Sequence, residues 1–292
     1  MKVRKAVITA AGWGTRFLPL SKSVPKELLP LLDKPIIQYA VEEAVASGIE
    51  LVIIVTSQGK TAIESYFTRN TGLEHVLEKQ EKTVLLNKIR SLSEMVDICF
   101  VPQVEVLGLG HAVLSTRAVI GNEPFAVILP DDLFDLKEKV LQKMINIYNE
   151  NEGSVVALRT VKPSEVGRYG IVEVDKKTES LYQIKNLVEK PQPSLAPSNL
   201  AVMGRYILMP EIFTALESTT PGWGGEIQLT DGLKWLLQKQ SIFGYQIQGD
   251  YYDTGTIPGW IQTTVAFALK HPEYGPSLRN TLSSFNDDLH QG

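Results

Sequence analysis

The stretch AAGWGTRFLPLSKSVPKELLP, residues 10–30, places glycines and basic side chains where they could bind a phosphate. Gly12 and Gly14 follow a short apolar run, and glycines let backbone N–H groups approach a phosphate closely. Arg16 comes two residues later and Lys26 stands near the end of the stretch. The prolines of the stretch forbid a long helix and stiffen the loop. This loop is therefore predicted to hold a triphosphate with little loss of chain entropy.

Two common phosphate-binding motifs are missing from this loop. The dinucleotide fingerprint G-x-G-x-x-G needs a third glycine, and Phe17 occupies that position. The acidic residue expected about 20 residues further on is represented only by Asp33, in a turn before a proline. The P-loop pattern G-x-x-x-x-G-K-[ST] is absent. A nicotinamide oxidoreductase and a P-loop hydrolase are therefore both disfavoured.

Alternating strands and helices are expected to position the loop. In the first half, buried strands are predicted at residues 5–12, 50–57, 97–103, 123–132 and 154–161, with helices at 35–48, 110–121 and 137–153. In the second half, residues 169–175 and 180–191 predict an antiparallel hairpin, 199–208 a strand, and 226–240 and 259–271 helices. Residues 277–292 show little periodicity and are expected to fray.

The predicted fold class is α/β: a doubly wound, mostly parallel (Rossmann-like) sheet with inserted antiparallel β elements. Continuous apolar strands that alternate with helices indicate a parallel sheet covered on both faces. The glycine-rich loop follows the first strand, and ligands of parallel sheets gather at the carboxyl edge. The loop is therefore expected at the ligand-binding edge.

Composition excludes several classes of protein. The 292 residues carry a net charge of −4, which argues against a generally basic nucleic-acid-binding surface. No apolar run reaches the ~18–20 residues of a membrane span. The apolar stretch at residues 6–11 is too short for a signal peptide. Cys99, the single cysteine, can form no intrachain disulfide and is expected to be buried. We expect a cytoplasmic protein that binds neither nucleic acid nor membranes.

The loop and seven later motifs together resemble the sugar-1-phosphate nucleotidylyltransferases. After GWGTRFLP…PKELLP the chain continues through DKPIIQYAVEEA, GLGHAVL, VILPDD, VEKP, PSNLAVMGRYIL, GEIQLTD and YDTG, in the order and spacing of that family. The resemblance covers residues 5–270. It implies one nucleotidyltransferase domain over residues 1–292. Within it, residues 1–135 mainly bind the nucleotide, 136–272 mainly bind the sugar phosphate, and 273–292 form a C-terminal tail.

The motifs are most similar to those of family members that use UTP and glucose 1-phosphate. The resemblance then implies in-line transfer of the uridylyl group to glucose 1-phosphate, giving UDP-glucose and pyrophosphate. It assigns the catalytic roles to Arg16 on the triphosphate, Lys26 near the reacting centre and Lys190 on the sugar phosphate. It assigns Mg²⁺ to Asp131 and Asp253, because hard carboxylate oxygens suit that ion. A homodimer or homotetramer is also implied.

The resemblance places further residues around the substrates. Gln103 would pair with the uracil edge through one amide donor and one acceptor. Trp13, where the family often has leucine, is interpreted as a packing residue rather than a base-stacking one. The nucleotide-binding set is Ala11, Gly12, Gly14, Thr15, Gln103 and Gly108, and the sugar-binding set is Asp132, Gly170 and Glu189.

Three departures from the family pattern each remove a positive charge near the expected site. Pro102 stands where arginine is common, Leu107 where lysine is frequent, and Ile257 where the block after YDTG often ends in lysine. They leave alternatives open: a thymidylyltransferase, an enzyme for another hexose 1-phosphate, or a non-catalytic regulatory paralogue that binds a UDP-sugar.

Overall fold

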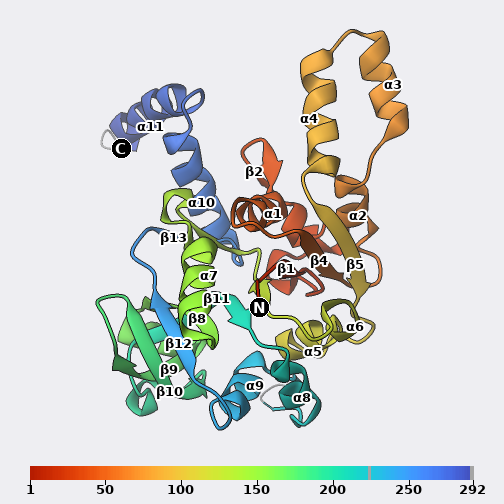
Figure 1. Cartoon of the computed structure of the whole chain (residues 1–292). Coiled ribbons are helices and arrows are strands. Elements are labelled where there is room, and N and C mark those ends of the chain that lie inside the picture. Colours follow the sequence, from red (N-terminus) through yellow and green to blue (C-terminus); the bar gives the residue numbers. More distant parts are fainter. Residues whose placement is uncertain (223–224, 290–292) are drawn as a thin grey trace.

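A nine-stranded mixed sheet forms the centre of the computed structural model, which describes residues 1–222 and 225–289 (Figure 1). The strand order is β5-β4-β1-β6-β11-β8-β12-β10-β9. The strands are β1 (Lys5–Thr9), β4 (Leu51–Thr56), β5 (Asp97–Pro102), β6 (Phe125–Ile128), β8 (Ser154–Thr160), β9 (Gly170–Lys176), β10 (Leu181–Glu189), β11 (Leu200–Leu208) and β12 (Ile242–Gln246). The predicted mixed α/β fold with a sheet and covering helices is confirmed.

The sheet is parallel in one part and largely antiparallel in the other. Strands β5, β4, β1 and β6 are parallel neighbours. Strand β11 then joins antiparallel between β6 and β8, and β10 pairs antiparallel with both β12 and β9. The predicted hairpin of β9 and β10 is confirmed. The predicted parallel pairing holds for β5, β4, β1 and β6 and for β8 with β12, whereas β9, β10 and β11 pair antiparallel with their neighbours. The strand patterns did not reveal these antiparallel pairings.

Helices cover both faces of the sheet. Alternate residues of β1 show the two layers: Ala6 and Ile8 belong to one core cluster and Val7 to the other. Residues of α1 and α7 join the first cluster, and residues of α5, α8 and α9 join the second. The helices of the fold are α1 (Ile36–Ala46), α2 (Thr61–Phe67), α3 (Thr71–Lys79), α4 (Thr83–Glu94), α5 (Leu109–Leu114), α6 (Arg117–Ile120), α7 (Val140–Asn151), α8 (Glu211–Glu217), α9 (Leu229–Leu236), α10 (Ile257–Lys270) and α11 (Gly275–Leu289).

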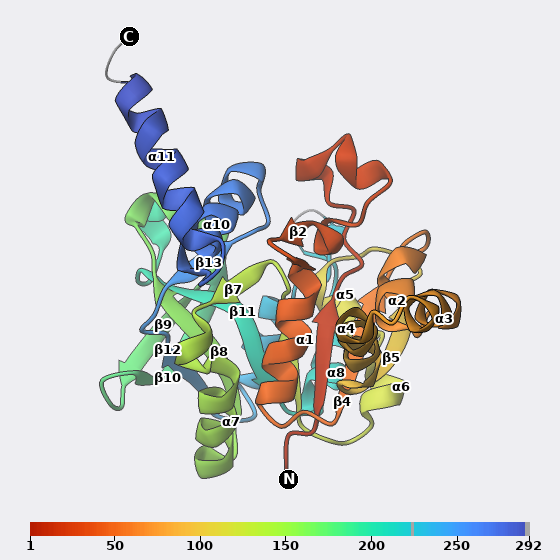
Figure 2. The same cartoon turned by 90° about the horizontal axis from the view of Figure 1, so that it is seen from above.

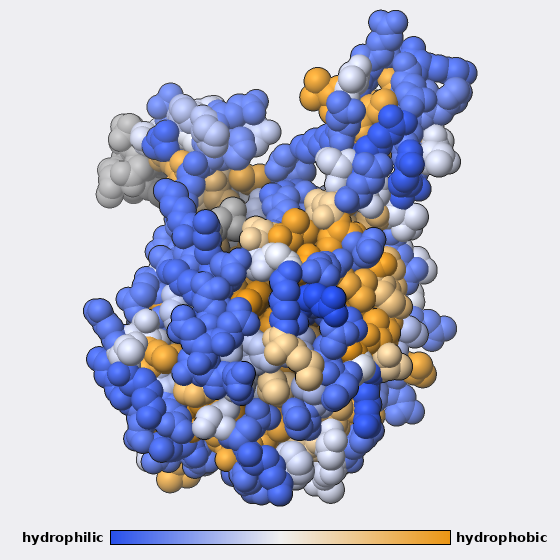
Figure 3. Space-filling view, in the orientation of Figure 1, coloured by the Kyte–Doolittle hydropathy of each residue, from blue (hydrophilic) through white to orange (hydrophobic). Residues whose placement is uncertain are grey.

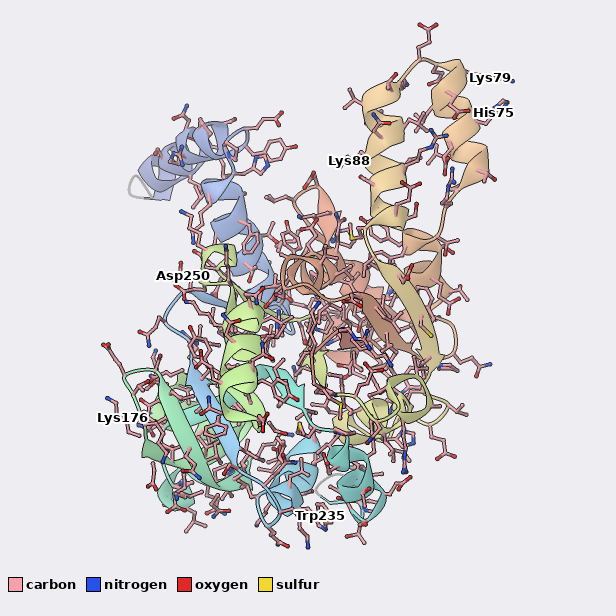
Figure 4. The ribbon with its side chains drawn as sticks, in the orientation of Figure 1. His75, Lys79, Lys88, Lys176, Trp235 and Asp250 are labelled. Atoms are coloured by element: carbon pink, nitrogen blue, oxygen red, sulfur yellow. The ribbon has the colours of Figure 1, made fainter. Side chains whose placement is uncertain are left out.

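Two helical extensions leave the body of the molecule (Figures 1 and 2). Helices α3 and α4 form an arm that the sequence did not predict, and apolar side chains are visible on it in Figure 3. Lys88 of α4 lies on the side toward β2 and donates to Asp33 Oδ2 at 2.8 Å, which ties the arm to the body (Figure 4). The second extension is α11. The expectation that residues 277–292 fray is wrong up to Leu289, and residues 290–292 lie outside the described part.

Short elements complete the frame of the site. Strands β7 (Asp132–Phe134) and β13 (Tyr251–Asp253) form a small antiparallel sheet, as do β2 (Pro30–Leu31) and β3 (Lys34–Pro35). Three single-turn 3₁₀ helices, η1 (Thr15–Phe17), η2 (Leu20–Lys22) and η3 (Lys26–Leu28), lie in the glycine-rich loop, so the predicted absence of a long helix is confirmed. Cys99 is only half-buried, because β5 is an edge strand. Within residues 1–222 and 225–289, no helix combines the length and apolar character that crossing a bilayer requires.

Candidate active site

Strands β7 and β13 bring Asp131 and Asp253, which are far apart in the sequence, close together. Asp253 pairs with Asp132 across the small sheet, and the N–H and hydroxyl of Thr254 donate to the Asp131 carbonyl at 2.8 and 2.9 Å. A Cβ atom at Gly255 would lie 3.0 Å from Asp131 Oδ2 and 3.0 Å from Asp253 Oδ1. Both carboxylate oxygens therefore border the space beside Gly255, which the absence of a side chain keeps open.

Two predicted phosphate-binding cations reach the same space. Arg16 Nη1 donates to the Gly255 carbonyl at 3.4 Å, and Lys26 Nζ lies 2.6 Å from Asp131 Oδ2. Burial alone would raise the pKa of Asp131, but the nearby Lys26 ammonium and the Arg16 guanidinium lower it below its ordinary value. Asp131 is therefore ionised at neutral pH. The arrangement concentrates positive charge beside two acids that could hold a cation.

Arg168 is a further cation of the site that was not predicted from the sequence. Its Nη2 lies 3.2 Å from Asp253 Oδ2. With Tyr169 and Asp253 it lines a cavity of about 470 Å³. The nearby Gly170 is in the predicted sugar-binding set, but an arginine at the end of a turn is usually a surface charge. Only the pairing of β7 with β13 places Arg168 against an acid of the site.

Both carboxylate oxygens of Asp132 accept hydrogen bonds from other residues of the protein. Its Oδ1 accepts from the Tyr251 hydroxyl at 2.7 Å and its Oδ2 accepts from the Gly204 N–H at 2.7 Å. Burial, and then the charge of Asp131, raise the pKa of Asp132 to about 6. Both oxygens thus join β7 to β13 and β11. This arrangement gives Asp132 a structural task beside the sugar-binding role expected for it.

The residues predicted on the sugar side also lie together. A Cβ atom at Gly170 would lie 3.3 Å from Glu189 Oε2, which accepts from the Thr230 hydroxyl at 2.7 Å. Lys190 Nζ lies 3.4 Å from Glu189 Oε1. Lys190 has a positive φ of 44°, a conformation uncommon for a residue with a side chain. The VEKP motif therefore turns sharply at this lysine.

Strand β11, which carries Tyr206, connects the sugar side with the acids. The Tyr206 side chain is buried, and burial together with the charges of Asp132 and Glu189 raises its pKa. The same strand contacts both groups: the Gly204 N–H donates to Asp132 Oδ2, and Ala201 pairs with Ile171, the neighbour of Gly170. Strand β11 therefore connects the residues predicted around the acids with those predicted on the sugar side.

Gln103 is placed at the end of β5 beside the GLGHAV turn, but its amide is already engaged. The side chain is 2% exposed, and Nε2 donates to the Gly108 carbonyl at 3.2 Å and lies 3.0 Å from His111 Nδ1. The predicted donor to a uracil edge is therefore taken up within the protein in this arrangement. His111 thus helps to position the Gln103 amide.

The glycine-rich loop leaves β1 as expected. Gly14 has a φ of 65°, and its carbonyl accepts from the Ser21 hydroxyl at 2.8 Å. Ala11 is buried and Thr15 is exposed. Trp13 is 65% exposed, so its interpretation as a packing residue is wrong. The loop turns this side chain outward because Gly12 and Gly14 on either side bend the backbone.

The three departures from the family pattern border the site without entering the acidic centre. Pro102 ends β5, and the Leu107 carbonyl accepts from Ile227 N–H at 2.8 Å. Ile257 begins α10 and is 43% exposed, two residues after Gly255. In the described part of the chain, no group of three or more histidine, cysteine, aspartate or glutamate side chains could hold a metal. Any cation here would rest on the pair formed by Asp131 and Asp253.

Comparison with known proteins shows the family to which this chain belongs. The family model described as "Nucleotidyl transferase" matches residues 5–268. A UTP–glucose-1-phosphate uridylyltransferase of Staphylococcus epidermidis is 46% identical over 278 residues, which is 95% of this chain and 96% of that protein. A UDP-glucose pyrophosphorylase solved with UDP-glucose is 44% identical with a TM-score of 0.83, covering 92% of this chain and 100% of that one. A UTP-bound homologue from Acinetobacter baumannii is 39% identical with a TM-score of 0.88, covering 96% and 98%. The chain belongs to the nucleotidyl transferase family.

Proposed function

We propose that this protein transfers the uridylyl group of UTP to glucose 1-phosphate, giving UDP-glucose and pyrophosphate. The observation that carries the proposal is the convergence of Arg16, Lys26, Asp131 and Asp253 beside Gly255. Both substrates are anions, so the reaction needs cations that offset their repulsion and stabilise the leaving group. Relatives with 46% identity over nearly the whole chain carry the name of this activity.

The chemical step is an in-line displacement at the α-phosphorus of UTP. A phosphate oxygen of glucose 1-phosphate forms a new bond to that phosphorus, and the bond to the oxygen bridging the α- and β-phosphates breaks. The electron pair of the broken bond leaves with pyrophosphate. A phosphate monoester is largely ionised at pH 7, so no general base is required. The protein therefore acts by orientation and by charge stabilisation.

Arg16 and Lys26 would stabilise the triphosphate. The planar guanidinium of Arg16 suits two oxygens of the β- and γ-phosphates, where negative charge develops as pyrophosphate leaves. The compact ammonium of Lys26 would lie nearer the α-phosphate. Lys190 would hold the phosphate of glucose 1-phosphate, and its sharp backbone turn fixes where the side chain starts.

A divalent cation fits the space beside Gly255. Two carboxylates face it, and Mg²⁺ is commonly bound by one or two carboxylates together with substrate phosphates and water. Asp131 and Asp253 would hold the ion, which when bound would neutralise phosphate charge. The pKa of Asp131, which lies below its ordinary value, keeps that ligand ionised.

The remaining predicted roles complete the proposal. The parallel strands β5, β4, β1 and β6, with helices on both faces, would serve as a doubly wound half in which residues 1–135 mainly bind the nucleotide. Residues 136–272 would mainly bind the sugar phosphate, and residues 273–292 would form a tail outside the chemistry. The nucleotide would contact Ala11, Gly12, Gly14, Thr15, Gln103 and Gly108, and the sugar would contact Asp132, Gly170 and Glu189.

A comparison of substrates and variants tests the proposal. Purified protein is given UTP, dTTP, ATP or GTP with glucose 1-phosphate or another hexose 1-phosphate, and pyrophosphate release is measured with and without Mg²⁺. Release is expected with UTP, glucose 1-phosphate and Mg²⁺ together. Lys190→Ala should raise the KM for glucose 1-phosphate. Lys185→Ala on β10, the strand that ends just before Lys190, should not, since Lys185 pairs with Asp175 on the exposed hairpin. Equal kinetics of the two variants would reject the role of Lys190.

A further inference from the structure

A buried ion pair lies under the glycine-rich loop and has no place in the chemistry described so far. Lys60 Nζ lies 2.9 Å from Glu27 Oε2, and the two side chains are 11% and 2% exposed. Lys60 immediately precedes α2, and Glu27 follows Lys26 in η3. Burial raises the pKa of Glu27 and lowers that of Lys60, so each charge depends on the other. Such a buried pair adds little net stability compared with apolar side chains.

Lys60 also binds the backbone of the loop. Its ammonium donates to the Ala10 carbonyl at 2.6 Å and to the Gly12 carbonyl at 2.7 Å, in addition to Glu27. A lysine ammonium has three hydrogens, and two carbonyls and one carboxylate use them all. One side chain thus holds two carbonyls of the chain segment that leaves β1.

Holding these carbonyls sets the direction of two N–H groups. The only cis peptide among the described residues is Leu18–Pro19, so the peptides after Ala10 and Gly12 are trans. In a planar trans peptide, the carbonyl and the following N–H point in opposite directions. The N–H groups of Ala11 and Trp13 therefore point away from Lys60. Among the described residues, no backbone carbonyl accepts from either of them.

We infer that Lys60, with Glu27 as its counter-ion, is a positioning residue that directs the Ala11 and Trp13 N–H groups toward the bound nucleotide. This inference rests on the proposed function and adds to it a residue that contacts no substrate. Glu27 joins this arrangement to the reacting centre, because the neighbouring Lys26 pairs with Asp131. One buried pair thereby fixes both the start of the loop and its catalytic lysine.

The test compares the loss of Lys60 alone with the loss of the whole ion pair. Lys60→Met removes the charge at nearly constant length but leaves Glu27 buried without its counter-ion, which threatens folding. The double variant Lys60→Met/Glu27→Gln removes both charges and avoids that cost. Lys79→Met, on the exposed outer part of α3 (Figure 4), is the matched control. For each protein we would measure thermal unfolding, kcat, both KM values and UTP affinity by calorimetry.

The double variant decides the inference. If Lys60 positions the loop, the KM and Kd for UTP rise about tenfold or more, as expected for lost charge-assisted hydrogen bonds. The KM for glucose 1-phosphate should stay within about twofold of the wild-type value, since that substrate uses other residues. A folded double variant with unchanged UTP affinity and KM would overturn the inference, because the ion pair would then serve stability alone.

If the proposed function is wrong, the wild-type protein itself releases no pyrophosphate from UTP and glucose 1-phosphate. This result differs from one in which only the double variant is impaired. UTP binding by calorimetry would still compare the wild-type protein with the double variant. A wild-type protein that binds UTP no more tightly than the double variant does would overturn the inference about Lys60, whatever the reaction is.

Discussion

Gly255→Ala should damage the reaction without unfolding the protein. The new Cβ atom would lie 3.0 Å from both Asp131 Oδ2 and Asp253 Oδ1, whereas ordinary contacts begin near 3.4 Å. Each carboxylate oxygen must then retreat by roughly 0.4 Å, and a displacement of about 1 Å in an active site can cost about 100-fold in rate. We therefore expect kcat to fall about tenfold. The Mg²⁺ concentration needed for half-maximal rate should rise, because the same oxygens are the proposed ligands.

Steady-state kinetics over a Mg²⁺ titration, together with thermal unfolding, would measure this effect. Both carboxylates are about a quarter exposed, so they can turn outward and the unfolding temperature should change little. Gly72→Ala is the control, because its Cβ would make an ordinary 3.5 Å contact on the remote helix α3. A folded Gly255→Ala protein with the wild-type kcat and Mg²⁺ dependence would refute the idea that chemistry occurs beside this glycine.

Two predictions concern stability. Phe213→Ala should lower the free energy of unfolding by about 3–5 kcal/mol, measured by denaturant titration; Phe213 is 2% exposed and stacks on Phe125 with ring centroids 5.2 Å apart. A loss below about 1 kcal/mol would contradict the described packing. Hydrogen bonds from Arg69 and Arg90 lower the pKa of Glu74 to about 2, below its unfolded value of about 4.3. Glu74 therefore stabilises the arm above about pH 5, and this contribution is lost as the pH falls toward 2. Glu74→Gln should lower the unfolding temperature at pH 7 and make little difference near pH 2, and an equal difference at both pH values would contradict the pairing.

The sequence was informative where function depends on short contiguous segments. The glycine-rich loop could be placed at the end of the first strand, because an apolar run followed by glycines has few other interpretations. The resemblance to nucleotidylyltransferases then assigned Asp131 and Asp253 to one site, and the structure places them together. Their meeting could not be derived from the residues alone, since it depends on the pairing of β7 with β13 across a long stretch of chain.

The residues that sequence reasoning missed act through long-range contacts. Lys60 and Arg168 look like surface charges in the sequence, and only the folded chain shows that they meet Glu27 and Asp253. Leucine is common at the position of Trp13 in the family, which favoured a packing role, but the side chain is 65% exposed. The antiparallel pairing of β11 with β6 and β8 was missed as well, because the apolar pattern of one strand shows that it is buried but not which strands it pairs with.

Phosphorus NMR of the complete reaction would show directly whether this protein makes UDP-glucose. The protein would be mixed with UTP, glucose 1-phosphate and Mg²⁺, and every phosphorus-containing product would be followed with time. We expect equal amounts of UDP-glucose and pyrophosphate, and a strongly reduced rate for Asp131→Asn. A folded protein that leaves both substrates unchanged, or that forms phosphate without UDP-glucose, would contradict the proposed function.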